Sequence, residues 1–169
     1  IEGFVKLTSV TTTTGNYYTL ISKTGNASPD FGWEVRLRKS ATAGKFLLDF
    51  IASTNGTTAG TVDTTNTTNF TVNANTWYYF AVTYNAGSVK RYFSSAAGGT
   101  NVSKIGTTGS MGTVLASTTA PMRIGAGPTS GTGASLFLTG SIDEIRFSQF
   151  LRANATGKIT IPSSQFTAD

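Results

Sequence analysis

The chain of 169 residues contains no cysteine and no histidine. Without thiols it can form neither a disulfide framework nor a thiolate metal site. Without imidazole it lacks the commonest general base and the commonest zinc ligand, and a serine–histidine or cysteine–histidine nucleophile cannot form within the chain. Its chemistry must therefore come from carboxylates, hydroxyls, amides, aromatic rings and basic side chains.

Long apolar runs and charged residues are also scarce. No run approaches the roughly 20 apolar residues that span a bilayer, so no membrane partner is expected. Charged residues make up 12% of the chain, whereas about 25% is usual. Glycine, serine, threonine and asparagine take their place, a composition that favours strands joined by polar turns and is common in secreted and virion surface proteins.

The net charge of +5 has two interpretations. It keeps the domain soluble, or it attracts an anionic glycan or another acidic surface. The basic residues are scattered, apart from a group made of Arg36, Arg38, Lys39 and Lys45 and the pair Lys90–Arg91. No single-strand binding motif is visible, so nucleic acid is not expected as a partner.

Helical periodicity is almost absent, and alternating runs of β-branched and aromatic residues recur between polar turns. The length fits one domain. The pattern predicts strands at 1–9, 17–23, 31–39, 45–53, 69–73, 76–85, 88–95, 121–126 and 140–149, with weaker ones near 59–63, 112–115 and 159–161. Many short strands with turn signals between them indicate an all-β fold, an antiparallel sandwich or barrel.

Two hairpins have a predictable register. Alternation in the first gives it one apolar face, made of Trp33, Val35, Leu37, Phe46, Leu48 and Phe50. That register places Arg36 near Asp49 on the outer face, since a slip by one residue would bury the acid. In the second hairpin the turn is Asn85-Ala86-Gly87. The strand before it, 76–85, is apolar on both faces and is expected to be central in its sheet.

The order of several segments resembles a known family. They are IEGFVKLTSV, YTLISKTGNASPDFGWEVRLR, NTWYYFAVTYNAGSVKRYF, APMRIGAG and GSIDEIRFSQFLRA. Together they resemble the laminin G-like domains of the concanavalin A-like lectin/glucanase superfamily, over residues 1–153. The resemblance implies a jelly-roll sandwich of two curved antiparallel sheets that binds its ligand on the loop rim or the concave face.

The tail, 154–169, is similar to tails that follow this domain in structural proteins of tailed phages. It is expected to return to the sheet edge or to contact a partner. Family members usually have an opening strand or two before the one resembling IEGFVKL, and this sequence begins inside that strand. Because a bare strand edge is a pairing hazard, we expect the first strand to pair with the tail around Lys158–Pro162 or with a neighbouring chain.

Asp143 and Glu144 form the most suggestive acidic pair, because glycoside hydrolases act through two carboxylates. Neighbouring residues of a strand face opposite sides of the sheet. Glucanases of this superfold instead carry their acid and nucleophile at alternate positions of one strand. The sequence therefore predicts no catalytic residue and no enzyme.

The predicted ligand-binding residues are Tyr17, Asn26, Asp30 and Tyr79. Strand parity points Tyr79, and either Tyr17 or Tyr18, away from the strongest apolar stripe, where a ring can stack on a sugar; the alternative is that they are core residues. Asp30, with Asn26 and nearby carbonyls, is the candidate for a calcium ion. Otherwise Asp30 forms a turn after Pro29, and no cofactor is needed.

These inferences favour a non-catalytic module that binds glycan or cell-surface polysaccharide and is displayed on a virion or a secreted protein. The alternative is a structural or decoration protein of a phage particle or filament, in which the sandwich contacts neighbouring subunits. A glycosidase acting through Asp143 or Glu144 is the third interpretation. The first two place the domain outside the cell or on a virion surface.

Overall fold

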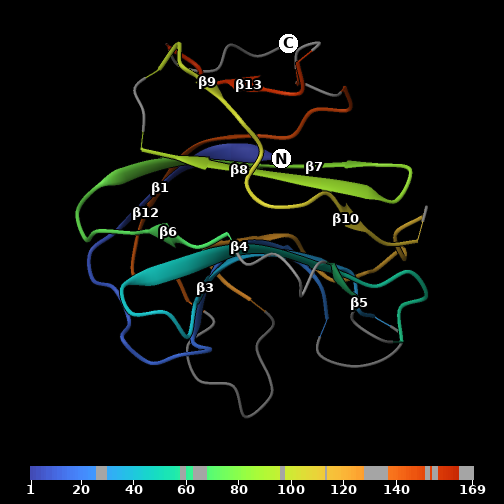
Figure 1. Cartoon of the computed structure of the whole chain (residues 1–169). Coiled ribbons are helices and arrows are strands. Elements are labelled where there is room, and N and C mark those ends of the chain that lie inside the picture. Colours follow the sequence, from blue (N-terminus) through green and yellow to red (C-terminus); the bar gives the residue numbers. More distant parts are fainter. Residues whose placement is uncertain are drawn as a thin grey trace.

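The computed structural model describes residues 1–25, 30–57, 60–62, 68–95, 98–112, 114–127, 137–150, 153 and 156–163. These residues form strands and no helix, and two antiparallel sheets face each other across a common core (Figure 1). The predicted all-β sandwich is therefore confirmed. Within the described ranges, no helix is long and apolar enough to cross a membrane.

Sheet A is the upper of the two main layers in Figure 1. Its strands, in spatial order, are β10 (Gly109–Ser110), β8 (Ser88–Ser94), β7 (Trp77–Asn85), β1 (Glu2–Leu7) and β12 (Gly140–Arg146). β7 is internal, between β8 and β1, as its two apolar faces predicted.

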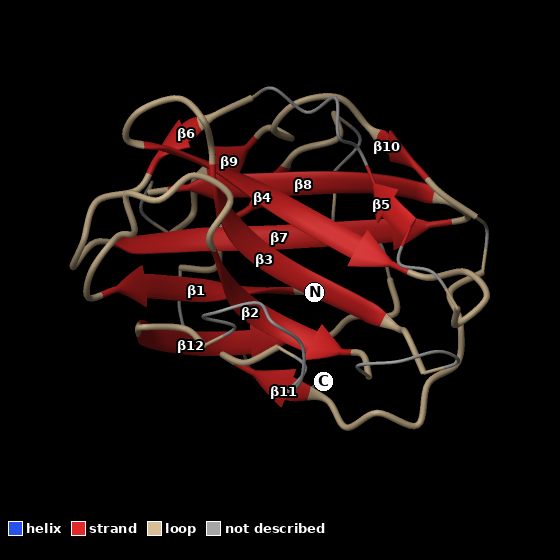
Figure 2. Cartoon of the chain, turned by 90° about the horizontal axis from the view of Figure 1, so that it is seen from below, coloured by secondary structure: helices blue, strands red, loops and turns tan. Residues whose placement is uncertain are grey.

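Sheet B is the lower layer. Its spatial order is β11 (Arg123–Ile124), β2 (Tyr17–Lys23), β3 (Trp33–Lys39), β4 (Lys45–Ala52) and β5 (Gly60–Val62), with β6 (Phe70–Thr71) also pairing with β4. Figure 2 shows β3 and β4 lying in front of β7 and β8, so the two sheets cover each other. The space between them holds the main core, which includes Leu20, Leu37 and Phe80, all 0% exposed.

The predicted register of the β3–β4 hairpin is confirmed. Leu37 pairs with Leu48, and Arg36 pairs with Asp49 on the outer face. The alternating pattern fails for the very short strands. Gly112, Val114 and Leu115, expected near a weak strand, lie outside any strand, whereas Gly109–Ser110 pairs with β8. A two-residue strand is placed by its partner, because it is too short to carry a periodic signal.

The described part of the tail covers the outer face of sheet A. Its strand β13 (Ile159–Thr160) pairs with β9 (Asn101–Val102), and Figure 1 shows both strands above sheet A. A second core lies beneath them, made of Tyr79, Ala81, Tyr92, Val102, Ile159 and Ile161. The tail was expected to return to the sheet edge or to contact a partner. Its described part lies over a sheet face, because that face of β7 and β8 is apolar.

The expected partner of the first strand was wrong. β1 lies between β7 and β12 and is paired on both sides, so neither the tail nor a second chain is needed at its edge. The expectation treated the first strand as an edge. It did not foresee that the GSIDEIR segment returns from the far end of the domain to take that position.

β12 contains a β-bulge. Glu2 pairs with Arg146 and Phe4 with Asp143, so Glu144 and Ile145 face one residue of β1. Glu144 has a φ of 52°, the left-handed conformation that such bulges use. Strict alternation therefore breaks, and Ile145 packs against the main core together with the residue three positions before it, Ile142.

Candidate functional site

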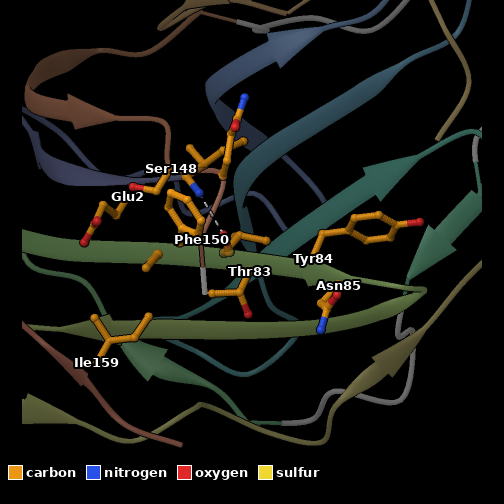
Figure 3. Close-up of a pocket in the computed structure, with 11 residues that line it drawn as sticks. Glu2, Thr83, Tyr84, Asn85, Ser148, Phe150 and Ile159 are labelled. Carbon is orange, nitrogen blue, oxygen red and sulfur yellow. Dashed lines mark hydrogen bonds between the residues drawn. The ribbon is translucent and has the colours of Figure 1, made fainter. Parts of the chain in front are cut away.

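A cavity of about 300 Å³ lies beside β7, between the start of β1, the segment that follows β12, and β13. Thr83 and Asn85 line it from β7, and Ser148, Gln149 and Phe150 line it from the segment after β12. Figure 3 shows Phe150, Thr83 and Ile159 projecting around the same space. We call this space the Phe150 cavity.

The local sequence explains how the Phe150 cavity is built. Thr83 and Asn85 alternate with Tyr84, which packs against the main core, so parity turns the two polar side chains to the other side of β7. After β12, Phe147 anchors the chain by packing on Trp33, with 6.4 Å between ring centres. Phe150 is 86% exposed, so its ring is presented to solvent.

Four polar side chains of the cavity are uncommitted. Within the described residues, no hydrogen bond or ion pair engages the side chains of Thr83, Asn85, Ser148 and Gln149. Binding sites typically combine an apolar or aromatic wall with a few polar groups that fix the ligand's orientation. Hydroxyl and carboxamide groups beside an exposed ring have that composition.

The carboxylate at the cavity, Glu2, is held in a structural network. Its Oε1 accepts hydrogen bonds from Arg146 Nε at 3.0 Å and Arg146 Nη2 at 2.8 Å. Its Oε2 accepts one from the Tyr79 hydroxyl at 2.5 Å. Glu2 is 3% exposed, and these charge-assisted hydrogen bonds hold its carboxylate in place.

Tyr79, one of the predicted ligand contacts, does not reach the surface. Parity turned it away from the main core as expected, but the second core covers it and it is 1% exposed. Phe4 packs edge-on against its ring at 5.5 Å. Tyr79 thus donates its hydroxyl hydrogen bond to Glu2, and its ring is too buried to contact a ligand.

Tyr17 lines a separate recess of about 270 Å³ at the loop rim, together with Ser9, Thr11 and Asn16. The guanidinium carbon of Arg36 lies 4.3 Å from the centre of its ring. Partial burial, with a smaller contribution from Glu34, raises the pKa of the Tyr17 phenol, so this group is a neutral hydroxyl at physiological pH. The Tyr17 side chain is half-buried, so it remains partly accessible to a ligand.

Asp30 joins two loops. Its Oδ1 accepts hydrogen bonds from the Thr118 hydroxyl, from the Thr119 amide at 2.8 Å and from the Thr119 hydroxyl at 3.3 Å. These donors, the Thr118 hydroxyl above all, lower the pKa of Asp30. Asn26, its predicted companion, lies outside the described residues.

Asp30 is the predicted calcium ligand. Calcium takes about six to eight oxygen ligands. Among the described residues, no group of three or more acidic, histidine or cysteine side chains comes together. One oxygen of Asp30 already accepts three donors. Asp30 is thus already engaged by the protein's own donors, and the absence of a calcium ion here stays a prediction.

The family comparison accounts for the sandwich. A laminin G-type model of the concanavalin A-like lectin/glucanases superfamily matches residues 1–155. The chain belongs to this superfamily. The match spans β1 to β12 and ends before β13. No curated protein and no solved structure matches the chain. Carbohydrate is a common ligand of the superfamily, which contains lectins as well as glucanases.

In this member of the superfamily, Asp143 and Glu144 serve the bulge of β12. Asp143 Oδ1 accepts a hydrogen bond from the Glu144 amide at 2.9 Å, which fixes the backbone at the bulge. Neither residue lines the Phe150 cavity. The backbone of β12, and not simple parity, decides where these two acids point.

Sequence reasoning missed the residues of the Phe150 cavity. Ser148, Gln149 and Phe150 follow the recognisable GSIDEIRF segment and have no periodicity of their own. One signal was available. A phenylalanine beyond the end of a predicted strand, after two polar residues, is not placed in the core by the strand pattern, which favours an exposed ring. Asn85 was assigned to the hairpin turn, and the tail that covers this side of sheet A was not foreseen.

Proposed function

We propose that this laminin G-like domain is a non-catalytic module that binds glycan in the Phe150 cavity. The observation that carries the proposal is one cavity that combines an exposed aromatic ring with uncommitted hydroxyl and carboxamide groups. Sugars present hydroxyls around an apolar face of C–H groups, which is the complementary chemistry. Membership of a superfamily in which carbohydrate is a common ligand supports the same class.

The size of the cavity suits a short stretch of sugar. A volume of about 300 Å³ is at the small end of ligand sites, which run to about 1,000 Å³. Covering the Phe150 ring removes apolar area from water, which contributes about 25 cal/mol per Å². The polar side chains then select among sugars by the positions of their hydroxyls.

A binding role without catalysis is supported by the state of Glu2. Glycoside hydrolysis requires two carboxyl groups on either side of the scissile bond. Glu2 is the acid among the residues that line the Phe150 cavity, and Arg146 and Tyr79 engage both its oxygens. The proposal places the domain outside the cell or on a virion surface, with a cell-surface polysaccharide as its partner.

The test is a glycan array with the purified domain, followed by titration of each ligand found. Phe150→Ala should weaken binding by about tenfold or more, because the stacking surface is lost. Val114→Ala is the matched control, since Val114 is another exposed apolar side chain, at 70%, and does not line the cavity. Retention of no glycan, or equal binding by Phe150→Ala and the native domain, would contradict the proposal.

A second candidate function is supported by apolar side chains near β11. Met122 and Ile124 are 50% and 55% exposed, and Phe137, which pairs with Ala126, is 67% exposed. Exposed apolar surface of this kind often marks a protein contact. A structural or decoration protein would use it against neighbouring subunits. Sedimentation of the native assembly tests this role, and a monomer unaffected by Ile124→Ser would exclude it.

A further inference from the structure

Arg36 and Arg38 share one carboxylate on the outer face of sheet B. Arg36 Nε lies 3.4 Å from Asp49 Oδ2, and Arg38 Nε lies 2.5 Å from the same oxygen. Arg38 Nη2 donates to Asp49 Oδ1 at 3.3 Å. Each guanidinium carries about five N–H donors, so the bonds to Asp49 use a minority of them. The trio therefore keeps spare donors and one surplus positive charge.

The other acid on this face is buried. Glu34 shares the outer face of β3 with the two arginines and is 7% exposed. The Thr19 hydroxyl donates to its Oε1 at 2.5 Å. Burial raises the pKa of Glu34, with Asp49 adding to the shift, so its carboxyl group holds its proton more tightly than an exposed one.

The arginines remain accessible while their positions are fixed. The side chain of Arg38 is 32% exposed and that of Arg36 is 17% exposed. Charges that are partly removed from water interact more strongly than fully exposed ones, because they are screened less. An anion that reaches these guanidinium groups meets donors already aligned by Asp49.

Tyr17 joins the arginines to the recess at the loop rim. It lies directly opposite Arg38 in the ladder between β2 and β3, and the Arg36 guanidinium packs over its ring at 4.3 Å. The same residue lines the recess of about 270 Å³, whose other polar side chains include Ser9, Thr11 and Asn16. A hydroxyl-rich recess and surplus guanidinium donors therefore meet at one aromatic side chain.

We propose that Tyr17, Arg36 and Arg38 form a second binding site, for a sugar that carries a carboxylate, such as a uronic acid. The sugar ring lies in the recess, and its carboxylate takes the guanidinium donors that Asp49 leaves. Arginine matches a carboxylate with two parallel hydrogen bonds, a geometry that Arg38 already makes with Asp49. None of these residues lines the Phe150 cavity, so this inference is independent of the proposed function.

The experiment is calorimetric titration with trigalacturonic acid and with its methyl ester, which has the same shape without the charge. The native domain should bind the acid about tenfold or more tightly than the ester. Arg38→Gln should remove that preference. Lys104→Gln, which deletes the same charge from an exposed loop residue, should change the affinity by less than about twofold. Arg36→Lys keeps the charge but loses the flat contact with Tyr17, and should also weaken binding.

Several results would overturn the inference. The first is absence of binding at millimolar acid, and the second is equal affinity for the acid and the ester. The third is an equal loss of affinity in Arg38→Gln and Lys104→Gln, which would indicate diffuse attraction of an anion. Loss of acid binding in Phe150→Ala would place the acid in the other cavity and have the same effect. Thermal unfolding of each variant shows whether it is folded. Arg36→Lys retains the ion pair and serves as the second variant if Arg38→Gln does not fold.

Discussion

Arg146 and Glu2 lie 144 positions apart in the sequence, yet they pair directly across β12 and β1 through two hydrogen bonds to one carboxylate oxygen. Their side chains are 15% and 4% exposed. The pair ties β12, the edge strand of sheet A, to its neighbour β1. Glu2 also lines the Phe150 cavity, so the pair links the stability of the fold to the shape of the site.

Arg146→Ala should destabilise the domain by about 3–5 kcal/mol, because it leaves the Glu2 carboxylate buried without its cation. The double variant Glu2→Gln/Arg146→Met should recover most of that loss, since it removes both charges and keeps the volume. Urea unfolding of the single and double variants measures both effects. Equal losses in the single and double variants would show that the ion pair itself matters little.

Glu34 makes stability depend on pH in a defined direction. Because its pKa is raised in the folded protein, the unfolded chain loses this proton first, and the free energy of unfolding falls as the pH rises above about 4.3. Glu34→Gln has no proton to lose and retains an acceptor for Thr19. Its stability relative to the native domain should therefore increase from acid to neutral pH. A difference that stays constant with pH, measured by urea unfolding, would refute this assignment.

Asp30 should act in the opposite direction. Its pKa is lowered in the folded protein, so the ionised carboxylate stabilises the fold above the ordinary aspartate value of about 3.9, and this contribution disappears as the pH falls through the folded pKa. Asp30→Asn should thus be less stable than the native domain at neutral pH and approach it in acid. Thermal unfolding with added calcium checks the site as well, and no shift is expected.

The tail should behave as part of the folded unit. Ile159 and Ile161 are 1% and 0% exposed in the second core. Ile161→Ala should lower the free energy of unfolding by about 2–5 kcal/mol, as deletion of buried aliphatic groups does. Thr160→Ala, at an exposed position of β13, is the matched control. Similar stability of the two variants would place the tail outside the cooperative structure.

The parts of the fold that could be predicted are those with local alternation. The β3–β4 ladder was predictable because a slip by one residue would have buried Asp49, and the centrality of β7 followed from its two apolar faces. The position of β1 was not predictable in the same way. Its second partner, β12, is distant in sequence, and the residue pattern of neither strand predicts that the two will pair.

The residues of the candidate sites were also predictable only where local strand alternation determined their position. Tyr17 remained partly accessible, whereas Tyr79 was buried by the second core, because parity gives the face of a strand but not what covers that face. The bulge at Glu144 altered the direction of the side chains around Asp143 through a single backbone conformation. Phe150 belongs to an irregular segment, whose position depends on contacts such as Phe147 with Trp33.

The Phe150 cavity takes its walls from β1, β7, the segment after β12, and β13. During synthesis on the ribosome, the first wall emerges long before the last, and no partial chain can complete the cavity. The proposed ligand capture would then wait until Ile159 has left the exit tunnel and settled over sheet A. A nascent or clipped chain that lacks β13 would lack one wall of the proposed site.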